Sequence, residues 1–160
     1  MTITYEGVSR AEYKAHRGQV RPGTKALHDT VLFMFAGSLT SGGIVADRNV
    51  RGGSAKSLHS VGRAADWMVR PGTGPRLGRT ARQVGDELAF RLVLAAEWIG
   101  VQEVIWYRRR WTPDKGWRRY FGVNQHTDHV HASQTQEAAD NAAPYDDQCK
   151  WYVHFLFPGT

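Results

Sequence analysis

The spacing of apolar residues predicts a helix near the start of the chain. Within residues 24–37, Leu27, Val31, Met34 and Phe35 recur at i, i+4, i+7 and i+8, which places them on one face of a helix. We expect Thr24 to cap this helix and Gly37 to end it. Residues 8–17 are polar and predict a short helix ahead of it.

The same spacing predicts a longer helix over residues 81–99. Its apolar positions fall on one face, and Gly100 follows as a stop. These positions are Val84, Leu88, Leu92, Ala95 and Ile99. We expect this face to be buried in the core.

Shorter apolar or alternating runs predict strands. They cover residues 43–48, 65–72, 101–107, 128–133 and 151–157. The sequence TPDKG predicts a turn, with WRRYFG returning from it. Because helices and strands mix without a regular βαβ rhythm, we predict one α+β domain over residues 1–160. Its sheet is expected to be mostly antiparallel, with helices on one side.

Composition narrows the class of protein. The chain has 160 residues and a net charge of +6, so its surface favours polyanionic partners. Its single cysteine, Cys149, excludes a disulfide scaffold and a cysteine-rich zinc finger. No apolar run approaches the roughly 20 residues that a membrane span needs. We see no secretory leader, and expect a protein made in the cytoplasm that binds neither membrane nor nucleic acid.

Three histidines gather in the sequence HTDHVHAS at residues 126–133. On a strand, His129 and His131 point to the same face, where two imidazoles can share a metal ion. An ordinary surface strand is the alternative. His126 is expected to be a loop residue, with a supporting role near the site as the alternative.

A second motif, SLHSVGRAADW at residues 57–67, supplies further ligand types. Gly62 permits a tight turn, after which a strand from Ala64 could carry Asp66 back beside His59. With one histidine of HVH, these residues would give three protein ligands and an open position, the arrangement of a catalytic zinc site. Taken singly, His59 could be a loop residue, and Asp66 a helix cap or the partner of Arg63 or Arg70.

Together the two motifs resemble the zinc D-alanyl-D-alanine carboxypeptidase family, which includes L-alanyl-D-glutamate endopeptidases and the Hedgehog-type fold. The family pattern is S-x-H-x-x-G-x-A-x-D, then an acid three residues before the last histidine of H-x-H. The chain matches it at every position, and the resemblance covers residues 48–133. The segments EVIWYRRRW, GWRRYFG and NQHTDHVHAS also resemble members from actinobacteria and their phages. The matching positions are Ser57, His59, Gly62, Ala64, Asp66, Asp128, His129 and His131.

The resemblance implies a role for each of these side chains. His59, Asp66 and His131 would hold Zn²⁺. Asp128 would act as general base, provided that it lies in the turn before the strand or on a bulge, because it is three residues from His131. His129 would line the site and stabilise the reaction intermediate.

The family also binds substrate through an arginine upstream of its first histidine. Arg48 is the preferred residue here, with Arg51 as the alternative, since a guanidinium suits a carboxylate or carbonyl. Ser57 would hydrogen-bond the substrate or serve only as a turn hydroxyl.

By resemblance the substrate is a peptidoglycan stem peptide or cross-link, and the protein is a monomeric phage endolysin or a related wall hydrolase. An endolysin would reach the wall after release through a holin. Two alternatives remain open: a zinc-bearing wall-binding module without activity, and a metal-dependent nuclease, in which residues 57–66 would have no role.

Overall fold

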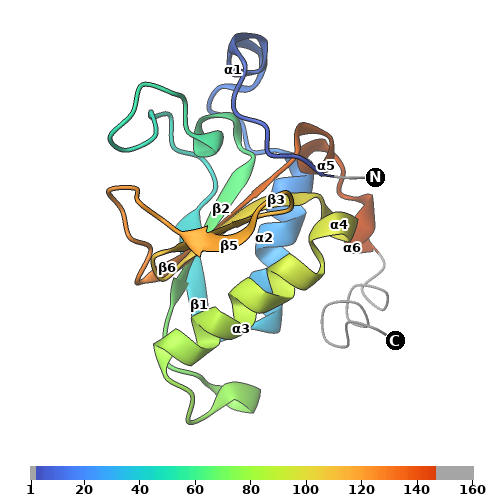
Figure 1. Ribbon diagram of the computed structural model, residues 1–160. Coiled ribbons are helices and arrows are strands. Elements are labelled where there is room, and N and C mark those ends of the chain that lie inside the picture. The colour runs from blue at the N-terminus through green and yellow to red at the C-terminus, as the bar shows by residue number, and fades with distance from the viewer. Residues whose placement is uncertain (1–2, 147–160) are drawn as a thin grey trace.

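A six-stranded antiparallel sheet forms the centre of the computed structural model, which describes residues 3–146 (Figure 1). Its spatial order is β1-β2-β6-β3-β4-β5. β6, the last strand among residues 3–146, thus lies between β2 and β3, so residues distant in the chain become neighbours. In chain order the strands are β1 (Leu39–Gly43), β2 (Ala64–Val69), β3 (Val101–Trp106), β4 (Arg109–Thr112), β5 (Gly116–Arg119) and β6 (His129–Gln134).

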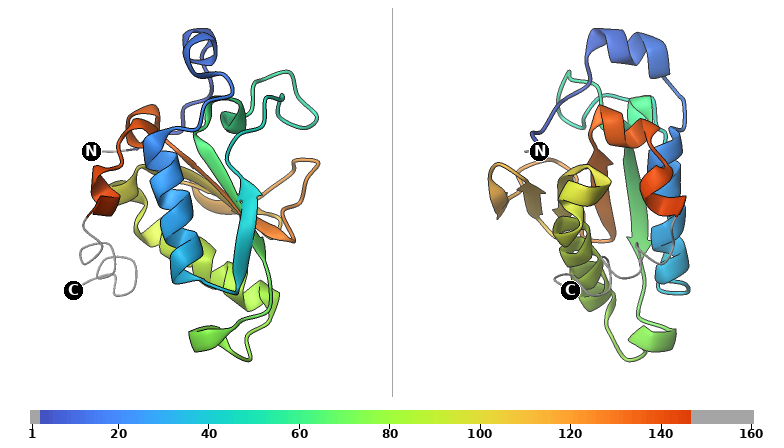
Figure 2. Two further views of the ribbon diagram at one scale, coloured as in Figure 1. Left: turned by 180° about the vertical axis from the view of Figure 1, so that it is seen from behind. Right: turned by 90° about the vertical axis from the view of Figure 1, so that its right-hand side faces the viewer.

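Short and long helices accompany this sheet, and Figure 2 shows them from two further sides. The two long helices, α2 and α3, contact the central strands. No helix among residues 3–146 is long and apolar enough to cross a membrane. The helices are α1 (Arg10–His16), α2 (Pro22–Met34), α3 (Ala81–Leu94), α4 (Ala96–Ile99), α5 (Gln136–Asp140) and α6 (Ala143–Asp146), with 3-10 turns η1 (Leu58–Val61) and η2 (Gly74–Arg76).

One face of the sheet packs on α2 and α3. Side chains alternate along each strand, so Trp67 of β2 and Val130 of β6 belong to the same buried core as Leu27 of α2 and Leu88 of α3. The Trp67 indole also donates a hydrogen bond to the His28 carbonyl of α2 (3.2 Å). The predicted α+β class, with an antiparallel sheet and its main helices on one side, is confirmed.

The predicted helix over residues 24–37 is shifted. It begins at Pro22, with Arg21 at the N-cap, and Thr24 is buried inside its first turn. Proline is favoured at the first helical position because the amide hydrogen it lacks would have no partner there. The helix ends at Met34, and Gly37 lies in the following turn at a φ of +78°.

Two other expectations about elements are corrected. The strand predicted over residues 43–48 lies earlier, at β1, because Leu39 pairs with Val69 of β2. The helix predicted over residues 81–99 breaks at Ala95 into α3 and α4. Its apolar positions are nevertheless all buried, and Gly100 ends it as expected.

The remaining predicted elements are found, with one exception. The polar segment 8–17 contains α1, and the TPDKG turn joins β4 to β5. The strands predicted over residues 65–72, 101–107 and 128–133 are β2, β3 and β6. The strand predicted over residues 151–157 falls outside the described residues.

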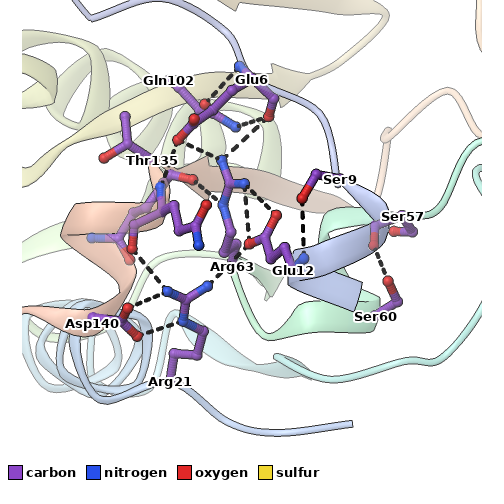
Figure 3. A network of polar contacts seen from close by, with 12 residues as sticks. Glu6, Ser9, Glu12, Arg21, Ser57, Ser60, Arg63, Gln102, Thr135 and Asp140 are labelled. Carbon is purple, nitrogen blue, oxygen red and sulfur yellow. Dashed lines mark hydrogen bonds and ion pairs between the residues drawn. The ribbon is translucent and has the colours of Figure 1, made fainter. Parts of the chain in front are cut away.

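A buried ionic network ties the N-terminal segment to the rest of the fold (Figure 3). Arg21 and Arg63 both contact the Glu12 carboxylate of α1 at 3.0 Å, and all three side chains are almost completely buried. Arg21 also pairs with Asp140 of α5, and Arg63 with Glu6 at 3.1 Å. The network thereby anchors the backbone beside η1.

Candidate metal centre

Strand register brings two of the predicted ligands together. Asp66 of β2 lies directly opposite His131 of β6, a position in which the Cβ atoms of antiparallel neighbours are about 5 Å apart. His129 is two residues before His131 and shares its face. This face is opposite to the one that packs on α2 and α3.

His59 joins this pair through the turn that precedes β2. It lies on η1, whose C-cap is Gly62 in the left-handed conformation (φ +66°). A Cβ on Gly62 would lie 2.0 Å from the Gln19 carbonyl oxygen. Glycine is thus required both by the backbone angle and by the neighbouring chain, as the motif predicts. Arg63, the next residue, points away to Glu12, which excludes it as the partner of Asp66.

Ligand atoms of His59, Asp66 and His131 converge within 4.8 Å of one another. His59 Nε2 lies 3.3 Å from Asp66 Oδ2 and 3.2 Å from His131 Nδ1. His131 Nδ1 lies 2.8 Å from Asp66 Oδ1. These three residues, hereafter the triad, are the only such group among residues 3–146, and the sequence predicted all three.

Electrostatics within the triad favour bound positive charge. Burial alone would raise the pKa of Asp66, but its interactions with His131 and His59 outweigh it and hold that pKa far below its usual value. Burial likewise opposes charge on His131, yet Asp66 and Glu103 raise its pKa to about 9. Without a metal ion, His131 is therefore protonated at neutral pH, and its positive charge balances the Asp66 and Glu103 carboxylates.

Asp128 and His129 form a hydrogen-bonded pair beside the triad. Asp128 immediately precedes β6, as its predicted role requires. Its exposed carboxylate accepts a hydrogen bond from His129 Nδ1 (2.7 Å), which lowers the pKa of Asp128. His129 Nε2 faces the triad, 4.0 Å from Asp66 Oδ2. The structure thus places Asp128 behind the His129 ring.

His126 is a buried member of the same histidine cluster. Its backbone has a φ of +50°, and its Nδ1 donates a hydrogen bond to the Asn124 carbonyl (2.7 Å). Its ring lies 4.6 Å from that of His129, centre to centre. Burial, and then the charges of His131 and His129, lower the pKa of His126 to about 3. It is a loop residue, as predicted, and is neutral at physiological pH.

A small open cleft leads to the triad. His59 and His131 line it together with Arg48, Arg51 and Ser57. Its volume is about 170 Å³, less than that of pockets that enclose a whole small ligand. A ligand bound there would therefore extend beyond the cleft.

The three residues predicted to bind substrate differ in their surroundings. Arg51 is exposed, and Arg48 is half-buried, with a long 3.5 Å contact to the Asn49 carbonyl. The Ser57 hydroxyl caps η1 by accepting a hydrogen bond from the His59 amide (3.3 Å). The arginines thus present positive charge to the cleft, while Ser57 has a structural bond of its own.

Sequence reasoning missed Glu103, which lies near the outward nitrogen of His131. His131 Nε2 is 3.7 Å from Glu103 Oε1. The available signal was a carboxylate within the apolar run VQEVIW, since a buried charge requires a partner.

The donor set fits a divalent metal ion such as zinc. Two imidazoles and one carboxylate are the ligand types that zinc accepts, and three of them leave a position open. His59 is already oriented for this role, because its Nδ1 donates to the Ile44 carbonyl (2.8 Å) and leaves Nε2 free to bind. The triad can therefore hold a metal ion, and several divalent ions accept these donors.

Comparison with known protein families gives a match that covers the site. The model of a family described as VldE, C-terminal domain, matches residues 16–131, more than half of the chain and all three residues of the triad. That description states no activity. No curated protein and no solved structure matches the chain.

Proposed function

The chain belongs to the VldE C-terminal domain family, and we propose that it is a zinc-dependent peptidase of peptidoglycan stem peptides or cross-links. The observation that carries the proposal is the triad of His59, Asp66 and His131, whose ligand atoms converge within 4.8 Å and whose two histidines line an open cleft. A site with three protein ligands and access from solvent is typical of catalytic rather than structural zinc.

Zinc bound by the triad would supply Lewis-acid polarisation of the scissile carbonyl and activation of the attacking water. His129 is the general base in this proposal. Its Nε2 faces the triad, and its Nδ1–H is held by Asp128. That hydrogen bond fixes the tautomer in which Nε2 can accept a proton. His129 would take a proton from water and deliver it to the departing amine.

Asp128 then acts through His129. Its carboxylate would stabilise the imidazolium that forms when His129 takes a proton, as in other carboxylate–histidine pairs. This differs from the direct role as base that the family resemblance implies. The 2.7 Å contact with His129 Nδ1 favours the indirect role.

Two arguments support the proposed substrate class: the positive charge of the cleft and the family resemblance of the sequence. Arg48 and Arg51 line the cleft beside the triad, and a guanidinium binds a carboxylate through two parallel hydrogen bonds. Stem peptides carry such carboxylates. The resemblance of residues 48–133 to zinc carboxypeptidases and endolysin peptidases selects peptidoglycan among acidic peptides. We include in the proposal that the protein serves as a phage endolysin or a related wall hydrolase.

Mass spectrometry of digested peptidoglycan tests this function. Purified diaminopimelate-type peptidoglycan would be incubated with the zinc-loaded protein, with protein stripped by a chelator, and with stripped protein given zinc again. His131→Ala removes one ligand, and His16→Ala is the matched control because His16 lies on α1, outside the cleft. New peptide termini are expected with the zinc-loaded protein, the restored protein and the control.

The position of the new termini would identify the bond that is cut. Termini that persist in the stripped protein and in His131→Ala would contradict a metal-dependent peptidase. Binding to walls without new termini would favour the non-catalytic wall-binding module. Cleavage of plasmid DNA that is lost in His131→Ala would favour the nuclease.

A further inference from the structure

Glu103 is a charged residue in a fully buried strand. All six residues of β3 are buried, and Glu103 is 5% exposed. Removing a carboxylate from water costs several kcal/mol unless charges and hydrogen bonds compensate it. The strand thus carries a buried carboxylate that requires charged or hydrogen-bonding partners.

Two basic groups meet this carboxylate, one at each oxygen. Arg110 of β4 pairs with Oε2 through its guanidinium Nε. His131 Nε2 lies 3.7 Å from Oε1. Register explains the second contact, since His131 is opposite Ile105 and Glu103 is two residues away on the same face of β3. Long side chains reach across such diagonal positions.

We propose that Glu103 positions His131 for metal binding. The proposal rests on the metal site that underlies the proposed function. His131 Nδ1 lies within the triad, so its Nε2 points away from the ligand atoms and towards Glu103. Histidines that bind metal commonly donate their other ring N–H to a carboxylate or carbonyl, which fixes the ring and makes the ligating nitrogen more basic. A ring movement of about half an ångström would bring the pair into hydrogen-bond range.

The two histidines of the triad then have different supports. His59 donates its outward N–H to the neutral Ile44 carbonyl at 2.8 Å. His131 faces the ionised Glu103 carboxylate, which strengthens a ligand more than a carbonyl does. The metal affinity of the site should consequently depend on the charge of Glu103 as well as on its shape.

Arg110 keeps Glu103 in this supporting position. A carboxylate next to a metal site can itself become a ligand, and a fourth protein ligand would close the position needed for water or substrate. Because Arg110 binds one carboxylate oxygen, Glu103 is held beside His131. Both Glu103 and Arg110 line the cleft beside His131.

Zinc affinity, measured by competition with a chelating dye, tests the proposal on the 160-residue chain. Glu103→Gln keeps the side-chain shape and removes the charge, and should weaken zinc binding about 10- to 100-fold, the range found for such supporting partners. Arg110→Gln breaks the same ion pair but leaves the carboxylate, so it should weaken zinc binding less. Glu137→Gln, at an exposed site on α5, is the matched control and should bind zinc as the wild type does.

Thermal unfolding of each metal-free variant shows whether the fold is kept. The proposal would be overturned if folded Glu103→Gln bound zinc as tightly as the wild type. It would also be overturned if Arg110→Gln lost as much zinc affinity as Glu103→Gln, because that result indicates an ion pair that only stabilises the fold. If Glu103→Gln fails to fold, Glu103→Asp provides the test: its shorter carboxylate retains the charge, and it should bind zinc more weakly than the wild type. Failure of the metal site itself gives a different result, because His131→Ala would then bind zinc as tightly as the wild type. Failure of the peptidase activity alone would leave peptidoglycan uncut while the zinc affinities follow the order expected here.

Discussion

At the scale of single residues, the role of each imidazole follows from the partner of its second nitrogen. His59 is held by a carbonyl, His129 by Asp128 and His126 by the Asn124 carbonyl. A neutral imidazole has one donor and one acceptor nitrogen, so each partner fixes which nitrogen remains as the acceptor. His129 is left with an acceptor towards the triad, which suits a base.

Substitution of His129 should lower activity without removing the metal ion. We expect His129→Gln to reduce kcat/KM for stem-peptide cleavage by about 10²- to 10⁴-fold, the usual contribution of a general acid–base group. Asp128→Asn should cause a smaller loss, because it perturbs the His129 tautomer and leaves the ring in place. The measurement is steady-state cleavage with the zinc content of each variant, and His16→Gln is the control.

The reverse order of effects would contradict this assignment. If Asp128→Asn were inactive and His129→Gln retained the wild-type rate, Asp128 would itself be the base, as the family resemblance implies.

At the scale of elements, the turn between η1 and β2 sets the distance between His59 and Asp66. Gly62 occupies the left-handed region and packs against the Gln19 carbonyl. Gly116, which begins β5, has a similar φ of +61° with nothing near its missing side chain. Substitution of Gly116 therefore measures the cost of the left-handed backbone angle alone. Substitution of Gly62 measures that cost together with the cost of close packing.

We expect Gly116→Ala to lower the free energy of unfolding by about 1–2 kcal/mol, the cost of a left-handed non-glycine residue. Gly62→Ala should lower it further because its Cβ meets backbone, and it should also weaken zinc binding by moving His59. Chemical denaturation and zinc competition of both variants measure this. Equal destabilisation, with unchanged zinc affinity in Gly62→Ala, would show that the turn does not position the ligand.

A second element-scale feature, the attachment of η2 to α3, makes stability depend on pH. Arg76 contacts both oxygens of Glu87 at 3.1 Å, and Arg91 contacts it at 2.9 Å. Burial would raise the pKa of Glu87, but these arginines outweigh it and lower the pKa below 4.5. A carboxylate with a lowered pKa in the folded state stabilises the fold above its unfolded pKa.

The stabilisation by Glu87 should therefore be present above about pH 4.5 and disappear as the pH falls through the lower, folded pKa. Denaturant unfolding of the wild type and Glu87→Gln from pH 7 to pH 2 measures it. The difference in unfolding free energy should shrink over the acidic part of this range. A difference that stays constant with pH would contradict the ionic contribution.

Elements were predictable from sequence where local spacing determines them. The helix face of Val84, Leu88 and Leu92 and the strand containing His129 were found because each pattern is complete within a few residues. β1 was misplaced because the apolar run at residues 44–46 is the stronger local strand pattern, whereas residues 39–43 read LTSGG. The choice between them depends on pairing with β2, a contact that the sequence does not display.

At the scale of the whole molecule, a buried ionic network and the sheet order together hold the site. Arg63 follows Gly62 in the metal-site motif and reaches Glu12 on α1, so the N-terminal segment is fixed to the turn that carries His59. The triad was predictable because its two motifs are specific. The supports Glu103 and Glu12 were not, because they depend on strand register and on helix packing across the molecule.

Removal of the charge of Glu12 should destabilise the whole fold. Glu12→Gln leaves two buried guanidinium groups without full compensation, and loss of one partner from a buried pair typically costs about 3–5 kcal/mol. An exposed pair provides the control: Lys25→Gln removes the partner of Asp29 on α2 and should change stability by less than about 1 kcal/mol. The measurement is the free energy of unfolding in urea, and equal effects of the two substitutions would contradict the role of the network.

The measurement that tests the metal site most directly is anomalous diffraction at the zinc edge from crystals of the zinc-loaded protein. The account predicts one strong peak about 2.0–2.2 Å from His59 Nε2, an Asp66 carboxylate oxygen and His131 Nδ1. It also predicts no fourth protein ligand, with His131 Nε2 directed at Glu103. A peak at other residues, or none within the triad at saturating zinc, would contradict the account.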